Sequence, residues 1–118
     1  MDLMASKLLG KSTQDARPDL VAEARRMMLQ MSPQDVAQVQ QGIAARPDSI
    51  PTLKTINVST LVMMGEEDTL IPSSDGELMR QHIANSRLAV IPKAGHFAVW
   101  EQSEEAGKLV RQFVDGCQ

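Results

Sequence analysis

The chain has 118 residues, enough for one domain with a modest core, and 42% of them are hydrophobic. Its net charge of −3, from 12 Lys and Arg against 15 Asp and Glu, gives no electrostatic reason to expect a nucleic-acid partner, which normally requires a basic stripe. The longest apolar run, residues 61–64, is too short to span a bilayer, and a single cysteine without a signal-peptide pattern predicts a soluble, cytoplasmic protein with no membrane partner.

The first part of the chain has helical periodicity and no strand pattern. Pro18 suits the first turn of a helix, and apolar residues follow it at spacings of three and four, namely Leu20, Ala24, Met27, Met28 and Met31. A second helix is expected from Ser32 as N-cap to Arg46, with an apolar stripe of Val36, Val39 and Ile43. We therefore predict two amphipathic helices after a loose N-terminus, then a connector with one short turn around Leu53.

Strand and helix alternate after the connector. Residues 60–64 form a short apolar run closed by Gly65, which is typical of a buried strand. A capping-box spacing at Ser74 and Glu77 predicts a helix over 74–85, with Leu78, Met79 and Ile83 on its buried face. A second strand is expected over 88–91. A last helix is expected from about Ser103, with an apolar face made of Ala106, Leu109, Val110 and Phe113.

Asp68 and His96 are the candidate catalytic residues, because each lies in a loop that follows a predicted strand. If the two strands are parallel neighbours, their carboxyl ends bring both loops to one edge of the sheet, where ligands bind in open α/β sheets. There a carboxylate can accept a proton-bearing ring nitrogen of the histidine, fix its tautomer and stabilise the imidazolium. The other ring nitrogen is then free to act as a general base.

These segments resemble α/β-hydrolases, and the nearest resemblance is to esterase and enol-lactonase-like members. Residues 60–72 resemble the acid-bearing strand and loop of that family, an apolar strand followed by Gly-x-x-Asp, an apolar residue and Pro. Residues 91–97 resemble its histidine loop, and 17–46 resemble its helical cap. The resemblance implies a partial α/β-hydrolase fold: two parallel strands with flanking helices, preceded by a cap segment. It divides the chain into a cap-like segment with connector over 1–57 and a strand–helix part over 58–118.

The nucleophile of that family is not recognisable here. It sits on a Gly-x-Ser-x-Gly elbow that precedes the acid and the histidine in chain order, and none of the nine serines has glycine two residues before and two after it. Ser73 and Ser74 are better interpreted as helix caps, and Cys117 lies at the chain end. We therefore expect the C-terminal portion of an ester or lactone hydrolase. It would be inactive alone and would act on a small-molecule ester or lactone when an N-terminal half completes it.

A second interpretation is a non-catalytic interaction module. Without the neighbour it has in the complete family sheet, the strand at 60–64 would present an open edge, which favours self-association or pairing with a complementary chain. We expect no cofactor and no metal, because Glu66, Glu67 and Asp68 alone supply too few converging oxygens for a cation. His82 is interpreted as a solvated helix residue and Trp100 as a packing residue.

Overall fold

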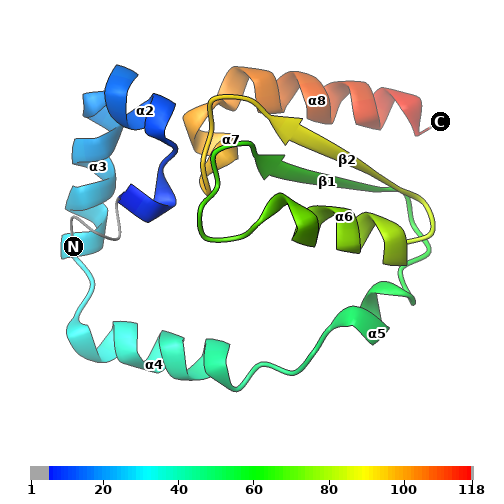
Figure 1. The fold of residues 1–118 in the computed structure, drawn as a ribbon, viewed down its shortest axis with the longest axis horizontal. Coiled ribbons are helices and arrows are strands. Elements are labelled where there is room, and N and C mark those ends of the chain that lie inside the picture. The colour runs from blue at the N-terminus through cyan, green and yellow to red at the C-terminus, as the bar shows by residue number, and fades with distance from the viewer. Residues whose placement is uncertain (1–5, 118) are drawn as a thin grey trace.

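Helices precede the sheet in the computed structural model, which describes residues 6–117. They are α2 (Lys11–Ala16), α3 (Pro18–Leu29), α4 (Pro33–Ala44) and the single turn α5 (Ile50–Leu53). The alternating part follows, with β1 (Thr60–Gly65), α6 (Ser73–His82), β2 (Ser86–Ile91), α7 (Ala98–Glu101) and α8 (Ser103–Gly116). Figure 1 shows β1 and β2 side by side, with α6 and α8 on either side of the strands.

The two strands form a parallel pair, as the sequence predicts. Their register runs from Thr60 opposite Ser86 to Gly65 opposite Ile91, so both strands end at the same level. β2 begins at Ser86, two residues before the predicted start. One core cluster lies at the carboxyl ends of the strands, where Ile91 of β2 packs with three buried alanines and with Met63 and Leu109; the alanines are Ala94, Ala98 and Ala106.

The crossover helix α6 differs from its prediction in three respects, the first being that it ends at His82 and not at 85, because Ile83 is already extended. It begins at Ser73 with Pro72 in the N-cap position, and no side chain caps it, so the capping box and the capping roles of Ser73 and Ser74 are wrong. The buried residue of this helix is Gly76, which faces β1. A Cβ at this position would lie 2.2 Å from the sulfur of Met64. Leu78 lies two residues, or about 200° of helical turn, after Gly76. Leu78 therefore faces away from β1 and is 37% exposed, contrary to its predicted place on the buried face.

The expected loose N-terminus is wrong for the residues from Leu8 onward, and residues 1–5 lie outside the described part. Leu9 is 2% exposed, and the carbonyl of Leu8 accepts hydrogen bonds from the backbone N–H groups of His96 and Phe97. The short helix α2 follows at Lys11, where no helix was expected. This N-terminal segment is therefore packed against the loop that carries His96.

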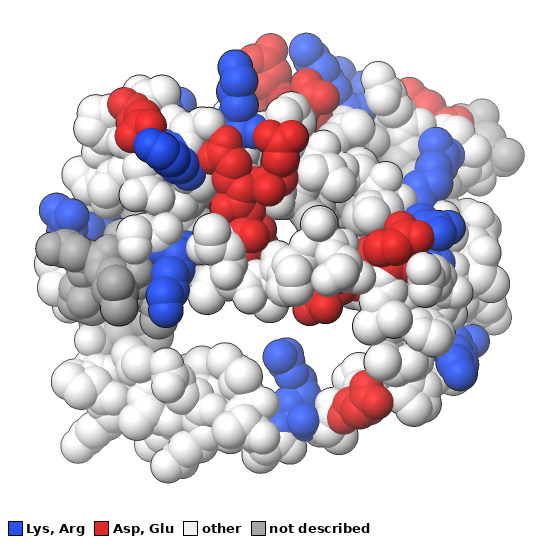
Figure 2. All heavy atoms as spheres, in the orientation of Figure 1, with Lys and Arg blue, Asp and Glu red and all other residues white. Residues whose placement is uncertain are grey.

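Helices α3 and α4 follow their predictions closely, but the apolar face of α4 is uncovered, whereas α3 buries Ala24. Ser32 caps α4 by accepting a hydrogen bond from the N–H of Asp35 at 3.1 Å, as predicted. The predicted stripe of α4 stays exposed, with Val39 at 54%. Figure 2 shows an opening between this helix, at the lower left, and the rest of the molecule. Within the described part of the chain, no helix combines the length and the apolar character needed to cross a membrane.

Candidate active site

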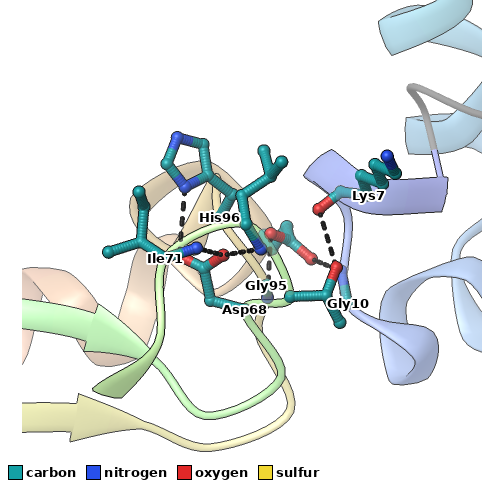
Figure 3. Close-up of polar contacts among 9 residues, drawn as sticks. Lys7, Gly10, Asp68, Ile71, Gly95 and His96 are labelled. Carbon is teal, nitrogen blue, oxygen red and sulfur yellow. Dashed lines mark hydrogen bonds and ion pairs between the residues drawn. The ribbon is translucent and has the colours of Figure 1, made fainter. Parts of the chain in front are cut away.

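The structure brings Asp68 and His96 together at the carboxyl ends of the two strands. The loop after β1 carries Asp68, and the loop after β2 carries His96, so the parallel pairing puts both at one edge of the sheet. Asp68 Oδ2 lies 3.0 Å from Nδ1 of His96 (Figure 3). The acid is largely buried, with its side chain 6% exposed, whereas the imidazole is 36% exposed. One ring nitrogen is therefore held by the acid while the ring stays open to a reactant.

Hydrogen bonds keep Asp68 in the form that can hold the imidazole. Burial opposes its ionisation, but the N–H of Ile71, the ring of His96 and the N–H of Leu70 all favour the charged form, and together they lower the pKa of Asp68 below its ordinary value. The two backbone donors lie 3.0 and 2.9 Å from Oδ1. An ionised carboxylate only accepts hydrogen bonds, so the proton of the neutral imidazole belongs on Nδ1 and Nε2 can accept a proton.

Three glycines let the backbones of the site approach one another. A Cβ on Gly65, at the end of β1, would lie 2.0 Å from the carbonyl oxygen of Gly95, the residue before His96. A Cβ on Gly95 would lie 2.3 Å from the backbone nitrogen of Gly10. Distances this short are essentially never seen for a real Cβ, so larger side chains would push apart the acid loop, the histidine loop and the N-terminal segment.

Two carboxylates connect the N-terminal segment to these loops: Glu101, which the sequence analysis missed, and Glu67, which it considered only as an oxygen donor for a cation. Glu101, in α7, accepts the N–H of Gly10 at 2.7 Å and the N–H of Gly95 at 3.0 Å. Glu67, beside Asp68, accepts both the N–H and the hydroxyl of Ser12. Figure 3 shows Gly10 and Gly95 next to each other beside His96. The sequence does hint at a buried role for Glu101, since it is a single charged residue that follows three apolar ones in 98–101.

One hollow adjoins this site, and a second is connected to it through Leu8. The first, of about 670 Å³, reaches from His96 and Phe97 along α7 to Arg17. Trp100, predicted to pack near this end of the molecule, lines it and meets the ring of Phe97 edge-on at 6.4 Å between centroids. The other, of about 390 Å³, is an apolar groove between α3 and α4, lined by Leu8, Met28, Met31, Val36, Val39, Gln40 and Ile43. Leu8 lines this groove, and its carbonyl accepts a hydrogen bond from the backbone N–H of His96.

The remaining candidate residues lie away from the pair or lack the geometry for another site. His82 ends α6, the helix that leads away from the acid loop, and Cys117 is exposed after α8. Within residues 6–117, no three histidine, cysteine, aspartate or glutamate side chains converge in a way that could hold a metal ion.

Known proteins resemble both the sequence and the fold. No protein-family model matches the chain. It is 36% identical over 73 residues to a pimeloyl-[acyl-carrier protein] methyl ester esterase of Neisseria meningitidis, covering 62% of this chain and 28% of that protein. It is 37% identical over 68 residues to a 2-hydroxy-6-oxononadienedioate/2-hydroxy-6-oxononatrienedioate hydrolase of Pseudomonas putida, covering 58% of this chain and 24% of that protein.

Solved structures extend the similarity to nearly the whole chain. A thermophilic esterase from Thermogutta terrifontis superposes with a TM-score of 0.90 and 33% identity, over 98% of this chain and 43% of that one. An N-acyl homoserine lactone-degrading enzyme superposes with a TM-score of 0.73 and 25% identity, over 95% of this chain and 45% of that one.

The chain corresponds to the C-terminal part of an α/β-hydrolase. It spans about a quarter of the length of the curated relatives it matches and under half of the solved chains. The relationship is to hydrolases of esters and related compounds, and the partial α/β-hydrolase fold expected from the sequence is confirmed.

Proposed function

We propose that this chain supplies the acid and the base of an α/β-hydrolase that cleaves carboxylic esters or lactones, and that it is inactive alone. The nucleophile and the oxyanion donors would come from an N-terminal half with a Gly-x-Ser-x-Gly elbow. In this proposal residues 1–57 are the cap-like segment with its connector, and residues 58–118 are the C-terminal part of the catalytic domain.

One observation carries the proposal: the 3.0 Å contact between buried Asp68 and partly exposed His96 at the carboxyl ends of parallel strands. A histidine held on one side by an ionised acid is the arrangement that activates a serine. The exposed edge of the ring leaves room for that serine. The apolar groove between α3 and α4 supports an apolar acyl or ring group in the substrate.

The reaction assigns a separate step to each group. Nε2 of His96 removes the proton of the serine hydroxyl as its oxygen attacks the substrate carbonyl, and the resulting imidazolium is stabilised by Asp68. His96 then gives the proton to the leaving alkoxide when the ester bond breaks, which leaves an acyl-enzyme. Water, deprotonated in the same way, releases the carboxylic acid and restores the serine.

Complementation tests the proposal. The chain would be co-expressed with the part of the Thermogutta terrifontis esterase that it does not superpose on, and hydrolysis of a short-chain aryl ester would be followed. We expect activity in the complex and none in either part alone. His96→Ala should lower kcat/KM by about 10⁴-fold, because the serine loses its base. His82→Ala, the matched change at the chain's other histidine, should leave it unaltered.

Two results would contradict the proposal. A complex that forms, as judged by its elution volume, but has no activity sensitive to His96→Ala would remove the assigned catalytic role. Hydrolysis by the chain alone that is abolished in His96→Ala would show that the nucleophile lies within these 118 residues.

A second candidate function is a self-associating interaction module. Among residues 6–117, β1 pairs with β2 alone, and the apolar stripe of α4 is exposed. An open strand edge is a template for pairing with another chain, and we propose a second copy of this chain as the partner. Light scattering at micromolar concentration should then give a dimer or a larger species, whereas a monomer at these concentrations would argue against this function.

A further inference from the structure

Glu101 is a buried carboxylate that the proposed hydrolytic steps do not use. Glu101 is 5% exposed and is the charged residue of the short helix α7, whose other members are Ala98, Val99 and Trp100. Burying a carboxylate is costly unless it is well hydrogen-bonded. Its two oxygens are each engaged, one by Gly10 and one by Gly95, and both donors are backbone N–H groups.

Both donors lead directly to His96. Gly95 precedes the histidine in the chain, so its N–H fixes one side of the histidine loop. Gly10 belongs to the N-terminal segment, in which the carbonyl of Leu8 accepts the N–H groups of His96 at 2.9 Å and Phe97 at 3.3 Å. Glu101 therefore holds the histidine loop directly and also holds the segment to which that loop is bound.

We infer that Glu101 is a positioning residue, which fixes the backbone of His96 so that its ring meets Asp68. This inference rests on the proposed function for its catalytic consequence, but not for its structural one. The geometry needs a carboxylate at 101 because two N–H donors from different segments converge on it. The Asp68–His96 contact is made by side chains alone, so it depends on the position of the backbone that carries the ring.

An amide cannot replace Glu101, whereas it can replace Glu67, and this difference supplies a matched control. In Glu101→Gln the new side chain would accept one N–H and turn its own NH₂ toward the other, leaving two donors facing each other. At position 67 the partners are the N–H and the hydroxyl of Ser12. A hydroxyl can accept from an NH₂ group as readily as it donates to a carboxylate, so Glu67→Gln keeps both contacts.

Proton NMR of the chain itself tests the structural role without requiring hydrolysis. The proton shared between His96 Nδ1 and Asp68 should give a slowly exchanging downfield signal in the unaltered chain and in Glu67→Gln. Glu101→Gln should lose that signal while the amide shifts of β1 and β2 stay in place. Retention of the signal in folded Glu101→Gln would overturn the inference.

Two further measurements apply even where Glu101→Gln does not fold. Glu101→Asp keeps both acceptor oxygens but is one methylene shorter, so it should weaken the ring signal in the same sense. In the unaltered chain, the amide protons of Gly10 and Gly95 must be protected from solvent exchange. Fast exchange of either one would overturn the inference, whatever the variants do.

Kinetics in the complemented enzyme separates this inference from the proposed function. A displacement of the general base by about 1 Å costs about 100-fold in rate, so Glu101→Gln should lower kcat about 100-fold with KM nearly constant. Glu67→Gln should lower neither by more than about twofold. If Glu101→Gln loses the downfield Nδ1 proton signal of His96 but the complemented enzyme never hydrolyses the ester, the positioning role stands and the hydrolase proposal is rejected. An unaltered kcat in Glu101→Gln would reject the positioning role alone.

Discussion

The strand-bearing part of the molecule and its helical part use their apolar residues in different ways. Around the ends of β1 and β2, Ile91 is fully buried and packs with alanines of α7 and α8. In α4, Val36, Val39 and Ile43 have the same regular spacing that predicts a buried face, yet all three are exposed. Apolar periodicity thus tells which side of a helix is apolar, but not which surface covers it.

The largest expected effect contrasts a buried side chain at the end of β2 with an exposed one in α4. Ile91→Ala removes a fully buried side chain and leaves a cavity, so it should lower the free energy of unfolding by about 2–5 kcal/mol. Val39→Ala in α4 removes a side chain that is already 54% exposed and should change it by less than about 0.5 kcal/mol. Urea unfolding measures both. Equal losses would show that the groove of α4 is as closely packed as the sheet.

Replacing a glycine by alanine should lower the stability of the strand-bearing part but raise the stability of the helical part. Gly65→Ala places a Cβ 2.0 Å from the carbonyl oxygen of Gly95 and should destabilise the chain by about 1–3 kcal/mol, because backbone has to move. Gly42 lies in α4 with nothing within 4 Å of its Cβ position. Gly42→Ala should stabilise that helix by about 0.5–1 kcal/mol. Thermal melting checks Gly65→Ala, and hydrogen exchange of the α4 amides checks Gly42→Ala. A stable Gly65→Ala would contradict the close approach of the loops.

The Asp68–His96 contact should give a smaller and pH-dependent effect. The pKa of Asp68 is lower in the folded chain than its ordinary value, so its stabilising contribution is complete above the unfolded-state pKa of about 4 and is lost as the pH falls through the folded-state value. Asp68→Asn removes that contribution. The free energy of unfolding should fall by about 1 kcal/mol near pH 6, and the difference between the two chains should shrink below pH 4. A difference that stays constant with pH would count against an ionised Asp68.

Local patterns were enough to predict the strands, the parallel pairing and the two residues at their carboxyl ends. The two apolar runs are separated by a helix, which is long enough for a parallel crossover, and such a crossover puts both following loops at one edge. The N-terminal segment was beyond such reasoning, because Leu8 and Gly10 are held by residues about 90 positions away. The mistake in α6 has a similar origin. The glycine at position 76 gives no apolar signal, yet its lack of a side chain sets how the helix lies on β1.

The smallest effect tests whether α4 opens independently of the rest. Ser32 caps this helix through the N–H of Asp35, and such a cap is worth about 1 kcal/mol. α4 packs closely against none of the other described helices or strands. If it opens by itself, Ser32→Ala should speed hydrogen exchange in its first turn about fivefold and leave the urea midpoint unaltered. Ser73→Ala is the matched control, since Ser73 begins α6 without capping it. A midpoint that falls with Ser32→Ala would mean that α4 unfolds together with the sheet, and the contrast between the two parts would then lie in exposure alone.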